Sequence, residues 1–98
     1  MNIYRHQFVC HCPNNSLPIV YELQIETTET IMVEKITEEC AKEKSAFHEK
    51  LADKFLSIFG GRQILKAHHH GVDIETIRSG VSDEAERDHA QMRGDFYS

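Results

Sequence analysis

An apolar stripe at helical spacing runs through residues 45–61 and constrains the fold more than any other segment. Its members recur at intervals of three and four residues, the period of one helix face: Phe47, Leu51, Phe55, Ile58 and Phe59. Ser45 is placed to cap the start of this helix, and Gly60 and Gly61 are suited to the left-handed backbone that ends one. The segment is therefore predicted to be a helix with one face on a core.

Alternation with a period of two marks strands on both sides of this helix. A second helical stripe, formed by Val33, Ile36 and Cys40, comes directly before it. The predicted elements come in the order strand, strand, helix, helix, strand, strand: residues 4–12, 18–26, 33–44, 45–59, 63–70 and 71–78. This order (ββααββ) predicts an α+β fold in which two helices cover one face of an antiparallel sheet.

The composition argues against two classes of partner, nucleic acids and membranes. The chain has 98 residues and a net charge of -5, without a run of Lys or Arg, which argues against binding nucleic acid through its phosphates. No apolar run is long enough to span a membrane, and residues 1–5 lack a signal-peptide pattern. The odd number of three cysteines suits a reducing compartment. We therefore expect a cytoplasmic protein, and its short length favours association into a homo-oligomer.

The stretch Cys10-His11-Cys12 lies where the first predicted strand enters a turn rich in Pro, Asn and Ser. A thiol at such an exit is accessible, and a neighbouring imidazole favours the thiolate that acts as a nucleophile or a metal ligand. The alternative is an ordinary pair of strand cysteines. Cys12, next to Pro13, is the stronger candidate of the two.

Three successive histidines, His68, His69 and His70, end the third predicted strand. On a strand, His68 and His70 point one way and His69 the other. With Cys12, the pair His68 and His70 makes a possible zinc site. The alternative is a set of polar strand residues at a subunit interface.

His48 and Glu49 lie near the start of the predicted helix, beside its apolar stripe. A carboxylate in a partly apolar cleft can accept two hydrogen bonds from an N–H and an amino group on one edge of a purine or pterin. The alternative is two solvated side chains on the polar face of a helix.

These motifs, taken in order over about residues 6–78, resemble the tunnelling-fold (T-fold) superfamily, which includes GTP cyclohydrolase I. The resemblance is strongest to the nitrile reductase of queuosine biosynthesis and the archaeosine-forming amidinotransferase. Their Cys-Pro, four residues and Pro motif is matched by Cys12, Pro13 and Pro18, and their Phe-His-Glu by Phe47, His48 and Glu49. The resemblance implies a T-fold domain over residues 1–79 that assembles into a barrel with sites between subunits. Residues 80–98 are predicted to be a short helix or a disordered tail.

By the same resemblance, Cys12 is the nucleophile that forms a thioimide with a nitrile, and His48 is a proton donor. Glu49 anchors the base, and Phe47 and His69 are further candidates for contacting it. Two departures stand out. Ile19 replaces the aspartate that follows the second proline of the family, and the nicotinamide-binding run is replaced by residues 34–46, rich in Glu and Lys. Reduction with NADPH is therefore not expected, and addition of ammonia to give an amidine is favoured.

The likeness to GTP cyclohydrolase I is more distant. Ala67 and His68 match the Ala-His before its second zinc cysteine, but His70 stands at that cysteine and Asn15 at a histidine ligand. The sequence thus predicts a protein that binds a deazapurine, purine or pterin and needs no cofactor. A non-catalytic binding module and a zinc hydrolase using Cys12, His68 and His70 remain as alternatives.

Overall fold

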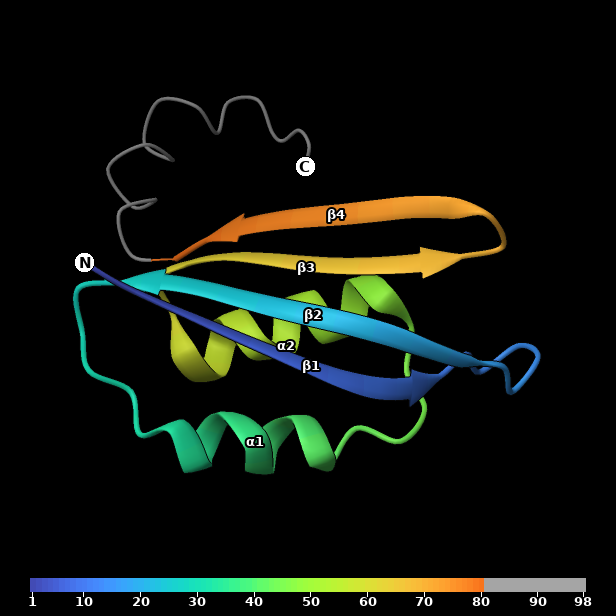
Figure 1. Ribbon diagram of the computed structural model, residues 1–98, viewed down its shortest axis with the longest axis horizontal. Helices are drawn as coiled ribbons and strands as arrows, with labels where there is room; N and C mark the ends of the chain where they lie inside the picture. Colours follow the sequence, from blue (N-terminus) through green and yellow to red (C-terminus); the bar gives the residue numbers. More distant parts are fainter. Residues whose placement is uncertain (81–98) are drawn as a thin grey trace.

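The computed structural model describes residues 1–80 and confirms an α+β fold with the predicted order of elements. A four-stranded antiparallel sheet has its strands side by side in chain order, and two helices connect the second strand to the third (Figure 1). The elements are β1 (Asn2–His11), β2 (Pro18–Thr27), α1 (Val33–Ala41), α2 (His48–Phe59), β3 (Arg62–His69) and β4 (Val72–Ser79). Of the tail predicted over residues 80–98, all but residue 80 lies outside the described residues.

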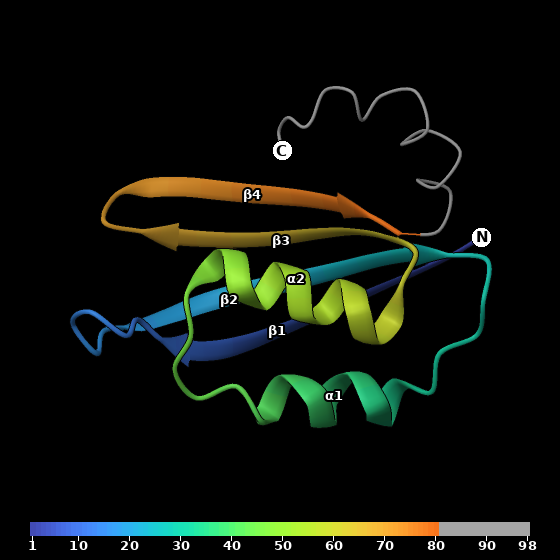
Figure 2. The same ribbon diagram turned by 180° about the vertical axis from the view of Figure 1, so that it is seen from behind.

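Both helices lie on the same side of the sheet, the covered face, and no other element of residues 1–80 lies on the opposite side, the open face (Figure 2). Helix α2 packs on β3 and β4, and α1 runs beside it along β1. Residues that pair across the four strands form rows. One row, Phe8, Tyr21, Ala67 and Ile74, points to the covered face that carries the helices. The next row, which starts at Gln7, points to the open face. None of the helices in residues 1–80 is both long and apolar enough to cross a bilayer.

The core is the layer between α2 and the covered face. Leu51, Ala52 and Phe55 of α2 are buried, and the Phe55 ring meets the Phe8 ring edge-on with 5.7 Å between centroids. Burying one such large apolar side chain stabilises a fold by about 1.5–3 kcal/mol. The predicted apolar stripe is therefore the surface that attaches α2 to the sheet, although Phe47 at its start is about half exposed.

The predicted cap at Ser45 is wrong, because the helix begins three residues later. Ser45 forms a parallel bridge with His11, in which the His11 amide donates to the Lys44 carbonyl (2.9 Å) and the Ala46 amide donates to the His11 carbonyl (3.3 Å). This extended pairing along the outer edge of β1 is incompatible with helical backbone. Phe47 takes the N-cap position in an extended conformation, without a side-chain hydrogen bond to the first turn.

The predicted end of α2 is confirmed. Gly60 and Gly61 both have positive φ, of 67° and 71°, and a Cβ on Gly61 would lie 2.6 Å from the carbonyl oxygen of Glu26. The Gln63 amide then donates to the carbonyls of Phe55 (3.0 Å) and Gly60 (2.7 Å), which satisfies acceptors left free where a helix ends.

Candidate functional site

Three segments that are far apart in the sequence meet at one end of the sheet. They are the loop from β1 to β2, the start of α2, and the turn from β3 to β4 (Figure 1). The first loop is closed by its backbone, since the Cys12 amide donates to the Leu17 carbonyl (2.9 Å) and the Ser16 amide to the Cys12 carbonyl (2.7 Å). Asn15 accepts a further bond from the Leu17 amide at 3.1 Å. This network holds Cys12 in place at the mouth of the loop.

A pocket of about 190 Å³ lies between these segments, on the covered side of the sheet. We call it the Cys12 pocket. Its lining residues are Cys12, Pro13, Asn14, Ile19, Tyr21, Ala46, Phe47, His48, Ala67, His69 and Ile74. Four of the predicted site residues are thus brought together around one hollow: Cys12, Phe47, His48 and His69.

The three thiols differ in their access to this pocket. Cys12 lines it and is 8% exposed, whereas Cys10, two residues earlier on β1, is fully buried. Burial raises the pKa of the Cys10 thiol, and burial also raises the pKa of Cys40 on α1 to about 12. Neither of these two thiols forms a thiolate readily, so Cys12 is the one placed for chemistry.

His48, the first residue of α2, presents an imidazole with unused hydrogen-bonding capacity. Both ring nitrogens are buried, and neither makes a hydrogen bond within the described residues. Burial lowers the pKa of His48, and nearby Arg78 lowers it too, while Glu49 and the backbone of Leu65 offset part of the shift. The ring is therefore neutral near pH 7, with one nitrogen as donor and the other as acceptor.

Tyr21 is a residue of the pocket that sequence reasoning missed. Its ring stacks on Phe8 with 5.3 Å between centroids and meets the His48 ring at 5.5 Å. Burial raises the pKa of the Tyr21 hydroxyl to about 12, so it remains a hydrogen-bond donor. In the sequence Tyr21 is one more inward residue of an alternating strand, and only the cross-strand register places it beneath α2.

Glu49 lies next to the pocket and not in it. Its side chain is 75% exposed and accepts a hydrogen bond from Arg78 of β4 at 2.7 Å. The same guanidinium donates to Asp53, one turn further along α2, at 3.0 Å. Burial opposes a charge on Arg78, but these two carboxylates raise its pKa. The carboxylate of Glu49 therefore faces solvent at the outer rim of this end of the molecule.

The three histidines do not share one environment. His68 lies on the open face and pairs with Asp73 at 2.7 Å, while His70 is in the β3–β4 turn with φ of 53° and contacts Asn15 at 3.3 Å. The strand alternation that would align His68 with His70 ends at His69. Among the described residues, no three His, Cys, Asp or Glu side chains are grouped as metal ligands.

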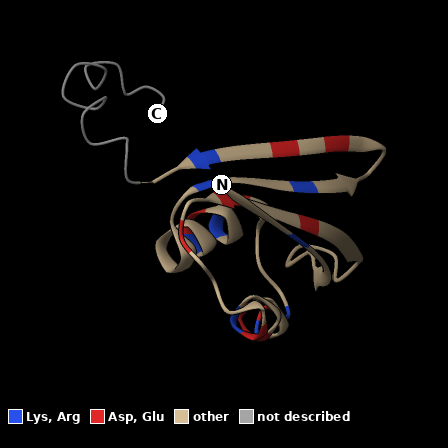
Figure 3. Cartoon of the chain, turned by 60° about the vertical axis from the view of Figure 1, so that its left-hand side comes forward, with Lys and Arg blue, Asp and Glu red and all other residues tan. Residues whose placement is uncertain are grey.

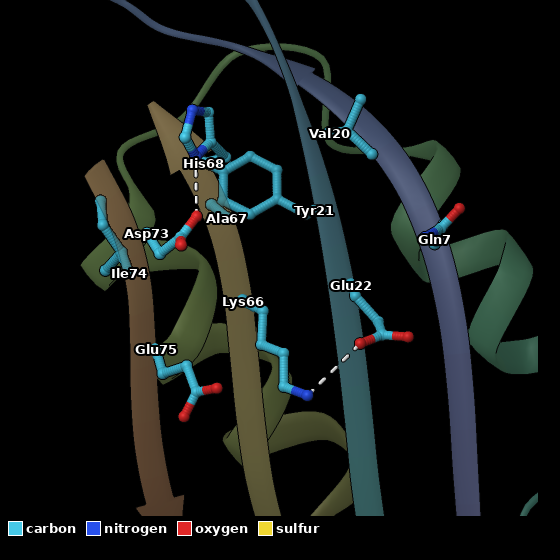
Figure 4. Close-up of a pocket in the computed structure, with 10 residues that line it drawn as sticks. All are labelled: Gln7, Val20, Tyr21, Glu22, Lys66, Ala67, His68, Asp73, Ile74 and Glu75. Atoms are coloured by element: carbon cyan, nitrogen blue, oxygen red, sulfur yellow. Dashed lines mark hydrogen bonds and ion pairs between the residues drawn. The ribbon is translucent and has the colours of Figure 1, made fainter. Parts of the chain in front are cut away.

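The open face carries a separate hollow of about 270 Å³, drawn in Figure 4. Lys66 reaches towards Glu22 there, with 3.6 Å between nitrogen and oxygen, and His68 towards Asp73. Bands of Lys and Arg and bands of Asp and Glu both occur on the strands and helices (Figure 3). The open-face hollow thus has ion-paired walls, in contrast to the Cys12 pocket.

Comparison with protein-family models, curated proteins and solved structures finds no match to the chain. What the site can do must therefore be argued from its chemistry. A thiol, a neutral imidazole, a phenol and the aromatic ring of Phe47 suit an uncharged planar molecule with an electrophilic atom near the thiol.

The unpaired nitrogens of His48 predict that this residue lowers stability. Replacing it by Phe (His48→Phe) keeps the ring against Tyr21 and removes two buried polar atoms without partners, so unfolding should cost about 1–2 kcal/mol more. Chemical denaturation at neutral pH measures the gain. His6→Phe is the matched control, since His6 is a half-buried ring that stacks on Phe8 outside the pocket; it should change stability by less than about 0.5 kcal/mol.

The same variant isolates a pH effect. Because the pKa of His48 is lowered on folding from 6.5, the unfolded chain binds more protons, and stability rises with pH through this window. Above about pH 6.5, His48 is neutral in both states and its titration costs no stability. As the pH falls from there to the pKa of His48 in the folded protein, the free energy of unfolding decreases, because protonation favours the unfolded chain. The stability advantage of His48→Phe should accordingly grow on acidification; an advantage that is constant with pH would contradict a neutral buried His48.

Proposed function

We propose that this chain is a T-fold protein that binds a planar heterocyclic base in the Cys12 pocket, with Cys12 as the nucleophile. One observation carries the proposal. Four residues that the sequence predicts for the site, Cys12, Phe47, His48 and His69, come from three segments and line one pocket. The base would be a deazapurine, a purine or a pterin, and the protein would act in the cytoplasm.

The chemistry favoured is addition of ammonia to a nitrile. The Cys12 sulfur attacks the nitrile carbon, a carbon–sulfur bond forms, and one carbon–nitrogen π-bond gives its electron pair to nitrogen, which takes up the proton of the thiol. The product is a thioimide. Ammonia then adds to the same carbon and the sulfur leaves with its bonding electrons, recovering its proton and yielding an amidine. No oxidant or reductant is required.

A second subunit would complete the site. Pockets that enclose a whole small ligand are typically about 300–1,000 Å³, and the Cys12 pocket, at about 190 Å³, holds only part of one. Within residues 1–80, both outer strands, β1 and β4, have a free edge along much of their length. Since they run in opposite directions, β4 of one copy would continue the antiparallel sheet with β1 of the next and so build a barrel.

Assembly is therefore the first test. Light scattering at micromolar concentration should give a closed homo-oligomer, because each copy offers one β1 edge and one β4 edge. Replacing Gln7 by Pro (Gln7→Pro) in mid-β1 should lower the mass, since proline cannot donate from an edge. A protein that remains monomeric at every concentration would exclude the barrel.

The second test is the base anchor. If Glu49 accepts two hydrogen bonds from a ring edge, Glu49→Gln should weaken base binding by roughly tenfold to a hundredfold, the usual loss for a charged hydrogen bond. Asp53→Asn is the matched control, because Asp53 also pairs with Arg78 and lies a turn away. Equal losses in the two variants, measured by calorimetry, would assign Glu49 to the Arg78 ion pair alone.

The third test is the nucleophile. Incubation with a heterocyclic nitrile should add the mass of the nitrile to Cys12, and Cys12→Ala should abolish the adduct, since the buried Cys10 and Cys40 are less available. Pulsed alkylation followed by peptide mass analysis should likewise modify Cys12 before Cys10. If Cys10 is alkylated before Cys12, the β1–β2 loop has only a structural role and Cys12 is not the nucleophile.

A non-catalytic binding module is the second candidate function, and Ile19 favours it. Ile19 is 5% exposed and lines the pocket at the position where the resembling family has an aspartate. A pocket that binds bases while forming no adduct with any nitrile would select this alternative.

A further inference from the structure

The Cys12 pocket has no Asp, Glu, Lys or Arg side chain in its wall within residues 1–80. Glu49 and Asp53, outside the pocket, are both paired with Arg78. A charged group placed inside the pocket would lose its hydration without gaining an ionic partner, which is strongly unfavourable.

Two side chains that line the pocket nevertheless have polar atoms without a hydrogen-bond partner in residues 1–80. Both ring nitrogens of His48 are buried and unpaired, although the Leu65 backbone acts on the pKa of the ring. The Tyr21 hydroxyl also makes no hydrogen bond within the described chain, unlike the Tyr4 hydroxyl on the same face of the sheet, which accepts from the Ile31 amide at 3.0 Å. With their ring centroids 5.5 Å apart, Tyr21 and His48 form one polar spot in a hollow whose other polar side chains are Asn14 and His69.

Burial is the main reason that His48 stays in the neutral form. Tyr21 of β2 meets its ring, Arg78 of β4 also favours the neutral form, and Glu49 and the Leu65 backbone oppose it, while Cys12 and His69 line the same pocket. Burial and Arg78 together outweigh Glu49 and lower its pKa. The polar spot therefore offers a phenol donor and a neutral imidazole, and no net charge.

We infer that the Cys12 pocket takes an uncharged, hydrogen-bonding group of its ligand, held by Tyr21 and His48, and rejects phosphate, carboxylate and ammonium groups. This deepens the proposed function and rests on it for the identity of the base. The ligand would be a free base or the base end of a nucleoside, with any charged part left at the rim. For a nitrile, the nitrogen is the uncharged acceptor, and it points to Tyr21 or His48 while its carbon meets the Cys12 sulfur.

Three small planar probes test this without any assumption about the base. Benzamide, benzoate and benzamidine have the same ring and nearly the same size, but their substituents are neutral, negative and positive. Benzamide should bind in the millimolar range, seen by protein-observed NMR as shifts in the resonances of Cys12 pocket residues, and the two ions should bind at least about tenfold more weakly.

Two variants locate the contacts. Tyr21→Phe and His48→Phe keep their rings and each remove hydrogen-bonding atoms, so each should weaken benzamide by about two- to tenfold. Tyr4→Phe is the matched control, because it deletes a hydroxyl from the same sheet face outside the pocket, and it should leave the affinity unchanged. Circular dichroism and the melting temperature establish that each variant is folded; if Tyr21→Phe does not fold, His48→Phe alone carries the test.

The outcomes separate this inference from the function on which it rests. Preference for benzamide, lost in the two pocket variants, supports it even if no heterocyclic base binds, in which case only the proposed function fails. Binding of benzoate or benzamidine as tight as that of benzamide overturns it, as does the absence of benzamide binding. If bases bind and Tyr21→Phe and His48→Phe behave like Tyr4→Phe, the proposed function stands and this inference is wrong.

Discussion

The contact between Phe55 and the covered face of the sheet is the interaction on which the rest of the structure depends. Phe55 has no exposed surface and meets Phe8 edge-on, which fixes the height and direction of α2 over the strands. The first turn of α2 then lies over the end of the sheet where the loops meet, and His48 is forced against Tyr21. The pocket is thus a consequence of how the helix is anchored two turns away.

The fold was predictable because every element shows its own period. Alternation in β2 and the stripe from Leu51 to Phe55 survive in the structure as buried rows. The start of α2 was not predictable, since Ser45 is an adequate cap by composition and only its long-range pairing with His11 keeps it extended. The preference of Ser45 for a helix N-cap is overridden there by its pairing with His11, more than thirty residues earlier in the chain. The apolar pattern of a helix carries no information on such a long-range contact.

The site was predictable in part, and the division has a physical basis. Cys12 and His48 carry reactive groups in recognisable motifs, so the sequence alone selects them, and the structure places both in one pocket. Tyr21 is indistinguishable in sequence from a core residue, because its role depends on which side chains face its hydroxyl. Glu49 is a different case: its type suggests an anchor for a base, and only the structure shows that its exposed carboxylate pairs with Arg78 of β4.

The pairing of His11 with residues 44–46 has a consequence for any strand that docks on β1. Alternate residues of an antiparallel strand point their amides and carbonyls to the same side, so Ile3, Arg5, Gln7 and Val9 share the outward edge with His11. At His11 both groups are already taken by Lys44 and Ala46. The connection between the helices therefore blocks the edge of β1 at His11. A strand that docks on β1 can pair with it only as far as Val9. Steric exclusion by residues 44–46 thus limits the register of that contact.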